Sequence, residues 1–83
     1  MASLVLGMLN YKFRTDDRWL EYKTLLTNYN RIPKADIKSV TITDVKGGKG
    51  KLQILGRGTV LAEIKMPVTW ARKAQDYILD EIK

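Results

Sequence analysis

Alternating apolar and polar positions mark three short strands in the second half of the chain. Apolar side chains recur at every second residue in segments 36–44, 51–55 and 59–64, and β-branched residues crowd into the first of them. A period of two is typical of strands with one buried face, and β-branched residues favour a pleated sheet. Glycine turns separate the segments, so we expect an antiparallel meander. The side chains predicted to line its buried face are Val40, Ile42, Leu52, Ile54, Val60 and Ile64.

After Pro67 the apolar period becomes that of a helix. Apolar residues recur at three- and four-residue spacing as far as Ile82, which predicts one amphipathic helix packed on the meander. Pro67 stands where helices tolerate proline, and Thr69 is expected to cap the first turn. Trp70 is predicted to close one end of the apolar layer. The apolar stripe consists of Trp70, Ala74, Tyr77, Ile78 and Ile82.

The first half of the chain has a weaker pattern. Residues 3–14 predict a first strand, and the turn-forming residues at 15–17 end it. Residues 18–27 alternate in a way that favours a second strand, although a short helix fits their apolar positions nearly as well. The asparagines and the proline of segment 28–33 predict a loop. Together with the meander this makes five strands.

These elements predict one domain over residues 1–83, of the α+β, mainly β class. We expect an antiparallel meander or a small, partly open barrel, capped by one C-terminal α-helix. Residues 1–17 either add a strand to the sheet or are the trace of a longer parent chain. The chain has more apolar residues than a five-stranded sheet and one helix can bury, so either the sheet curls into a barrel or the surplus meets another chain. The surplus comprises 4–9, Leu25, Leu26, Leu55 and Leu61.

Composition and charge narrow the classes of function. The 83 residues include 15 Lys and Arg against 9 Asp and Glu, a net charge of +6, which predicts attraction to nucleic acid or to an anionic membrane surface. The sequence has no cysteine and no histidine, which removes disulfides, thiolate metal sites and the commonest general base. Asp16 and Asp17 fit turn chemistry better than a catalytic pair. We therefore expect no enzymatic activity, no cofactor and no metal.

The apolar run at residues 4–9 is the one segment that raises the question of a membrane or export signal. It is far shorter than a membrane span. It also lacks the preceding positive charges and the small-residue cleavage site of a signal peptide. We therefore expect a cytoplasmic protein.

The main candidate site is the lysine-rich turn between the first two meander strands. Its sequence is Lys46-Gly47-Gly48-Lys49-Gly50-Lys51. A glycine backbone can form a concave nest of N–H groups for an anion, and flanking lysines add charge, although the spacing is not that of a P-loop. The alternative is a solvated hairpin tip without a ligand. The candidate anion-contacting residues are Lys46, Lys49, Lys51 and Arg57.

The order of these features resembles that of the bacterial pleckstrin-homology-like (PH-like) domains. Residues 31–40 match the family's Ile-Pro connection and Asp-Ile-x-x-Val strand, 50–54 match its glycine-containing hairpin, and 71–82 match its C-terminal helix. The family fold has seven strands in two nearly orthogonal sheets. The resemblance therefore implies either a trimmed version of that fold or two further strands within residues 1–30. In eukaryotic relatives a basic hairpin loop binds inositol phosphates, which suggests by analogy an anion at the lysine-rich turn.

We therefore expect a non-enzymatic bacterial interaction or assembly domain that binds protein partners or itself through sheet edges, as a homo-oligomer in the latter case. Anionic lipid or nucleic acid are further candidate partners, and no small-molecule substrate is expected. The alternative is a small basic nucleic-acid-binding protein, in which exposed aromatic side chains stack on bases. The aromatic candidates are Tyr11, Phe13, Trp19, Tyr22 and Tyr29, of which Tyr22 fits the core better.

Overall fold

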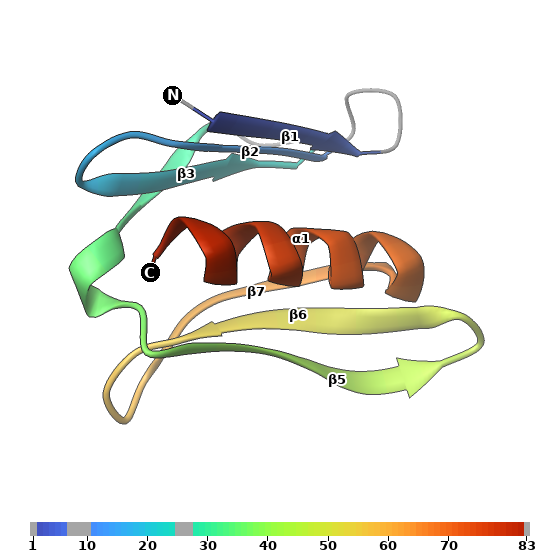
Figure 1. Cartoon of the computed structure of the whole chain (residues 1–83). Coiled ribbons are helices and arrows are strands. Elements are labelled where there is room, and N and C mark those ends of the chain that lie inside the picture. The colour runs from blue at the N-terminus through green and yellow to red at the C-terminus, as the bar shows by residue number, and fades with distance from the viewer. Residues whose placement is uncertain (1, 7–10, 25–27, 83) are drawn as a thin grey trace.

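Two open antiparallel sheets and one helix make up the protein (Figure 1). The computed structural model describes residues 2–6, 11–24 and 28–82. We call the four-stranded sheet, in the order β1-β2-β3-β4, sheet A, and the three-stranded sheet, β5-β6-β7, sheet B. The elements are β1 (Ala2–Leu6), β2 (Tyr11–Thr15), β3 (Trp19–Lys23), β4 (Asn30–Pro33), a 3-10 turn η1 (Lys34–Asp36), β5 (Ser39–Lys46), β6 (Lys49–Leu55), β7 (Val60–Pro67) and α1 (Val68–Glu81).

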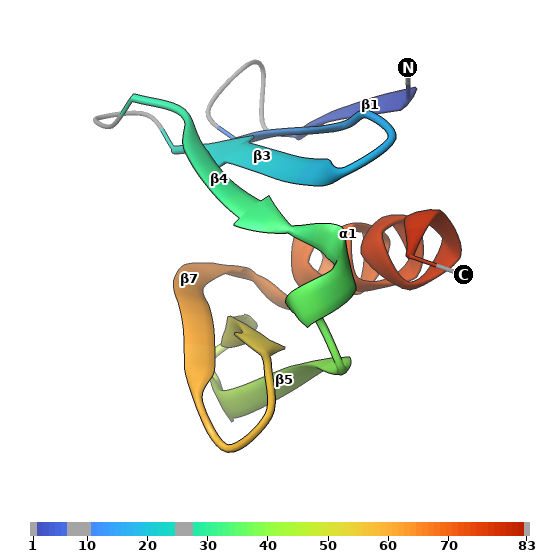
Figure 2. The ribbon, with the colours of Figure 1, turned by 90° about the vertical axis from the view of Figure 1, so that its left-hand side faces the viewer.

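Helix α1 lies between the two sheets in Figure 1, and Figure 2 shows that it occupies one side of the space between them, below β1. Its buried residues are Ala71, Ala74 and Ile78, each fully shielded from solvent. Two alanines in this stripe let the helix backbone approach its neighbours closely. The apolar side chains of both sheets and of the helix form one continuous cluster. That cluster consists of Leu6, Phe13, Leu20, Ile32, Ile37, Val40, Leu52, Ile54, Ala62, Ile64, Met66, Ala71, Ala74 and Ile78.

Polar contacts also join α1 to sheet A. The hydroxyl of Thr15, a buried residue at the end of β2, donates a hydrogen bond to Glu81 and lies 3.3 Å from the Tyr77 hydroxyl. At the other end of the helix, the Tyr11 ring contacts Trp70 edge-on, with 5.7 Å between the ring centroids. Trp70 is partly buried against the core at this end of the apolar layer, as predicted. A buried hydroxyl is costly unless it is hydrogen-bonded, so the Thr15 contacts help to fix sheet A against the helix.

Sheet B confirms the predicted meander with one correction. Ile54 pairs with Val40 on one side and with Ala62 on the other, and all three are buried. The pairing register shifts between Ile54 and Leu55, so Val60 pairs with Leu55 and is 50% exposed. The prediction that Val60 faces the helix is wrong, because a bulge reverses the side-chain alternation beyond it.

The first half of the chain contains four strands where the sequence predicted two. The predicted strand over 3–14 is two antiparallel strands, β1 and β2, and the residues that connect them lie outside the described part. The predicted strand over 18–27 is confirmed as β3, although residues 25–27 also lie outside the described part. The prediction of a loop over 28–33 is wrong for residues 30–33, which form strand β4. Strand β4 has only four residues and one buried side chain, Ile32, so it leaves no periodic pattern.

The start of α1 also differs from the prediction. Pro67 is the N-cap residue, and no side-chain hydrogen bond caps the helix. Thr69 lies inside the first turn, so its predicted capping role is wrong. The amide of Val68 instead donates to the carbonyl oxygen of Gly48 at 2.9 Å. A backbone contact with the β5–β6 hairpin therefore takes the place of the cap and fixes the hairpin to the helix.

The second sheet accounts for much of the apolar surplus. The sheets are open rather than closed into a barrel. Leu4 packs against the core and Leu6 is buried in it, on the face of sheet A that α1 covers. Leu61 also packs against the core because of the bulge beside it. Leu25 and Leu26 lie outside the described residues. Leu4, Leu6 and Leu61 are therefore covered within the chain itself, whereas Leu55 is half-buried outside the core cluster and Val5 is exposed.

Replacing Ile78 by alanine tests the position of the helix. Ile78 is fully buried, so Ile78→Ala should lower the free energy of unfolding by about 2–5 kcal/mol, through lost burial and the cavity left behind. Urea denaturation monitored by circular dichroism measures this change. Leu79→Ala is the matched control, because the neighbouring Leu79 is 36% exposed and should lose less than about 1 kcal/mol. Equal losses for the two variants would contradict the assigned helix face.

Candidate binding surfaces

The predicted lysine-rich turn is the tip of the β5–β6 hairpin. Lys46 pairs with Lys49, and the two residues between them, Gly47 and Gly48, have φ angles of +62° and +79°. Two consecutive positive φ angles are the requirement of a tight hairpin turn, and glycine adopts them at no steric cost. Hairpin geometry therefore explains both glycines without a ligand.

Four lysines surround a hollow of about 290 Å³ beside this turn, which we call the hairpin hollow. Lys51 is held there by Asp44, at 3.3 Å, and by Glu63, at 3.5 Å. The hydrogen bond that Lys51 donates to Asp44 and the charge of Glu63 raise the pKa of Lys51. Among the described residues, no carboxylate lies within 4.0 Å of the other three lysines. The hollow is lined by Asp44, Lys46, Lys49, Gly50, Lys51 and Lys65.

The structure places Arg57 away from the three predicted lysines. Arg57 lies in the β6–β7 turn, at the opposite end of β6 from Lys49. A strand of this length separates the two ends by more than about 20 Å. The four predicted anion-contacting residues therefore form two separate groups, and Lys65, which sequence analysis did not single out, belongs with the first.

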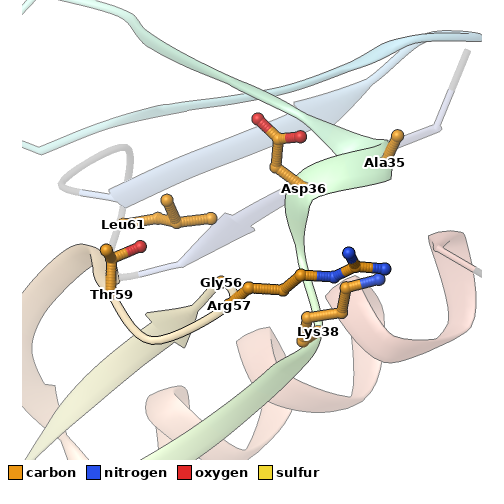
Figure 3. A pocket seen from close by; sticks show the side chains of 7 residues that line it. All are labelled: Ala35, Asp36, Lys38, Gly56, Arg57, Thr59 and Leu61. Carbon is orange, nitrogen blue, oxygen red and sulfur yellow. The ribbon is translucent and has the colours of Figure 1, made fainter.

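Arg57 and Lys38 line a second hollow, of about 330 Å³, between η1 and the β6–β7 turn. In Figure 3 these two side chains extend in the same direction, while the Asp36 carboxylate points away from them. The turn packs closely here, since a Cβ atom on Gly56 would lie 3.2 Å from the carbonyl oxygen of Asp36 and 3.3 Å from Leu61. This second hollow therefore presents two adjacent cations on a tightly packed turn.

A third basic surface, which sequence analysis did not identify, covers the outer face of sheet A. Its central row runs across three strands, with Arg14 paired to Glu21 and Glu21 to Arg31. The guanidinium of Arg14 lies 2.7 Å from one carboxylate oxygen of Glu21, and that of Arg31 lies 3.0 Å from the other. The Glu21 side chain is only 15% exposed. The two guanidinium groups compensate the negative charge of this shielded carboxylate. The adjacent row pairs Lys12 with Lys23.

Two aromatic rings pack against the cations of this outer face. The guanidinium carbon of Arg14 is 3.8 Å from the centroid of the Tyr29 ring, and the Lys23 ammonium is 5.8 Å from the same centroid. The guanidinium carbon of Arg31 is 4.7 Å from the centroid of the Trp19 ring. These are cation–π distances. We call this set of seven residues the outer face of sheet A: Lys12, Arg14, Trp19, Glu21, Lys23, Tyr29 and Arg31.

The other three aromatic candidates face the interior. Phe13 is buried and stacks with Tyr22, with 6.4 Å between the ring centroids. Burial raises the pKa of Tyr22, which agrees with its expected place in the core. Tyr11 contacts Trp70, and its hydroxyl donates to the carbonyl oxygen of Lys65. Only Trp19 and Tyr29, among the five predicted aromatics, lie on the outer face of sheet A.

Asp16 forms the turn between β2 and β3, as its sequence context indicated. Its carboxylate accepts hydrogen bonds from the backbone amides of Arg18, at 2.9 Å, and Trp19, at 2.8 Å. These two bonds lower the pKa of Asp16. The neighbouring Asp17 is exposed. A carboxylate with this role shapes a turn and positions Trp19 at the start of β3.

Glu21→Gln tests the charge network of the outer face. The amide keeps the shape of the carboxylate but leaves Arg14 and Arg31 without their counter-charge, so we expect the melting temperature to fall by about 5 °C at low salt. Differential scanning calorimetry measures the shift. Glu63→Gln is the control, because the Glu63 carboxylate lies on the more exposed outer side of sheet B. This substitution should shift the melting temperature by less than about 2 °C. Equal shifts would contradict a structural role for Glu21.

No described helix is long and apolar enough to cross a membrane. Comparisons of the chain with protein-family models, with curated proteins and with solved structures find no match. The function of this chain is therefore inferred from its own residues, and the resemblance to PH-like domains remains an expectation from the sequence.

Proposed function

We propose that this chain is a non-enzymatic interaction domain of the PH-like type, which binds an extended polypeptide along the free edge of β1. The polypeptide belongs to a protein partner or to a second copy of the chain. The order of four strands, three strands and one helix supports this proposal, because the resemblance implies seven strands in two sheets and a C-terminal helix. Open sheets also leave edge strands with backbone groups that can pair with another chain.

Three of the four edge strands have features that hinder pairing. Strand β4 is four residues long and ends in Pro33, which has no amide hydrogen. On β5, Gln75 donates to the carbonyl oxygen of Val40 at 2.7 Å, and a bulge with φ of +53° at Asp44 bends the strand. On β7, the Tyr11 hydroxyl donates a hydrogen bond to the carbonyl oxygen of Lys65. Proteins protect their sheet edges with features of these kinds.

Strand β1 has no comparable protection. Its five residues contain no proline and no bulge, and they pair in regular register with β2 alone. Within the described ranges, no side chain forms a hydrogen bond with the backbone of β1. One further strand would extend sheet A from this edge, with backbone hydrogen bonds supplying affinity and alternate side chains supplying specificity. The free edge of β1 is the single observation on which the proposal depends.

Contact with an anionic group at the hairpin hollow is a second, smaller part of the proposal. The supporting observation is that Lys46, Lys49 and Lys65 line a hollow in which Asp44 is already engaged by Lys51. Exposed ammonium groups around a concave surface attract phosphate or carboxylate groups. Arg57 contributes to the second hollow instead, together with Lys38.

Val5→Lys tests pairing of β1 between two copies. Val5 lies on β1 opposite Lys12 of β2 and is 49% exposed, so the new lysine would stand among the side chains of an added strand. An unchanged circular dichroism spectrum of the variant would show that β1 stays paired with β2 despite the neighbouring Lys12. Like charges placed across neighbouring strands are destabilising. Light scattering at high micromolar concentration should give a mass above 9.5 kDa for the natural chain and the monomer mass for Val5→Lys.

Val60→Lys is the matched control, because Val60 is equally exposed but lies on β7. This variant should associate as the natural chain does. A natural chain that stays monomeric over the whole concentration range removes self-assembly from the proposal. Equal loss of association in both variants argues against β1 as the edge that pairs.

A further inference from the structure

We propose that the outer face of sheet A binds single-stranded nucleic acid. The proposal is independent of pairing along β1 and of the hairpin hollow, since it concerns side chains on the face of β2, β3 and β4 rather than backbone edges or the turn. It rests on an excess of cations, on two aromatic rings among them, and on a sheet face that no described element covers.

The first observation is the charge balance of this face. Four cations stand against one carboxylate, which leaves an excess of three positive charges. Lys12 and Lys23 are direct cross-strand neighbours, and among the described residues no carboxylate lies within 4.0 Å of either. Like charges directly opposite each other destabilise a sheet. A phosphate group bound between the two ammonium groups would remove this repulsion.

The second observation is the way Glu21 holds the two arginines. Each of its carboxylate oxygens binds one guanidinium group, and each guanidinium lies over an aromatic ring. The side chains of Arg14 and Arg31 remain 39% and 54% exposed. Both guanidinium groups therefore remain accessible from solvent while Glu21 and an aromatic ring hold each of them in place. Bases of single strands stack on aromatic rings and on guanidinium planes of this kind.

The third observation is the open surface itself. Helix α1 lies on the other side of sheet A, and both views show no described element over the outer face (Figures 1 and 2). Four strands span roughly 14 Å across the sheet, and a five-residue strand spans roughly 17 Å along it. This area accommodates about four nucleotides, the lower end of the range for small single-strand-binding folds.

The side chains of this face fit nucleic acid better than a membrane surface. A protein that lies on a membrane inserts apolar side chains between the head groups. Val5 is the one large apolar side chain that the described part of this face exposes strongly. Trp19 and Tyr29 each contact a guanidinium group, and insertion of either ring into a lipid layer would break these cation–π contacts. Bases can instead stack on the guanidinium groups in place.

Fluorescence anisotropy of a labelled oligothymidylate of about eight nucleotides tests the proposal. The natural chain should bind it at low salt, and the logarithm of the binding constant should fall linearly with the logarithm of the salt concentration. The double variant Lys12→Ala/Lys23→Ala should weaken binding about tenfold and make the salt slope shallower by about 1.4, for two lost phosphate contacts. Because it removes a repulsive pair, this variant should fold at least as well as the natural chain.

Lys46→Ala/Lys49→Ala is the matched control. It lowers the net charge by the same two units at the hairpin hollow, and it should weaken binding by less than about threefold if the outer face is the site. Equal weakening by both double variants would mean attraction by net charge alone, and stronger weakening by the hairpin variant would place the anion at the hairpin. Either result overturns the proposal.

Two further comparisons distinguish base stacking from simple phosphate attraction. Trp19→Leu, which leaves Arg31 without its ring, should weaken binding of the oligothymidylate at least about fivefold and leave binding of a polyphosphate of equal charge unchanged. Equal effects on both ligands would contradict stacking. Vesicles of phosphatidylcholine with about 30% phosphatidylserine provide the membrane comparison. Tighter binding to these vesicles than to the oligothymidylate, or no oligothymidylate binding at low salt, would refute the proposal.

Discussion

Burial of helix α1 between two open sheets is the contact on which the rest of the structure depends. Neither sheet closes on itself, and each has an apolar face that needs a cover. The helix packs on sheet B and on β1 and β2 of sheet A, with Ala71 and Ala74 allowing close approach and Ile78 filling the space further along the same stripe. Thr15 and Tyr11 add polar and aromatic contacts between sheet A and the helix. A chain of 83 residues buries a limited fraction of its surface on folding. One helix that packs against both sheets lets this small chain form a single shared core.

This arrangement determines which surfaces remain for partners. Because α1 occupies the inner side, the outer face of sheet A keeps its cations and rings in solvent, and β1 keeps its free backbone edge. The contact between Val68 and Gly48 ties the hairpin hollow to the start of the helix, so that surface is also held in place by the core. The three basic groups lie on different parts of the molecule. Net charge alone therefore describes this protein poorly, and the position of each cluster decides what it can bind.

Much of sheet B and α1 could be predicted from the sequence, since a regular alternation of apolar residues and glycine turns determines local structure strongly. Sheet A was harder for identifiable physical reasons. Strand β4 has only Ile32 as a buried side chain, which gives no periodic signal. The bulge that exposes Val60 depends on pairing with Leu55, and sequence periodicity carries no information about that register. The outer face was missed for a related reason, because Arg14, Glu21 and Arg31 are brought together only by cross-strand pairing. Separation of Arg57 from Lys49, by contrast, already follows from the length of the predicted strand between them.

Amide hydrogen exchange of the native protein tests the central claim, that the helix joins both sheets into one cooperative unit, most directly. The informative amides are those of Phe13 in β2, Leu52 in β6 and Ala74 in α1, since β2 and β6 are inner strands with neighbours on both sides. If α1 holds both sheets together, the three amides should exchange only by global unfolding, with the same free energy. Exchange of Phe13 at a distinctly lower free energy, with Leu52 and Ala74 still protected, would show that sheet A opens independently and would contradict the account.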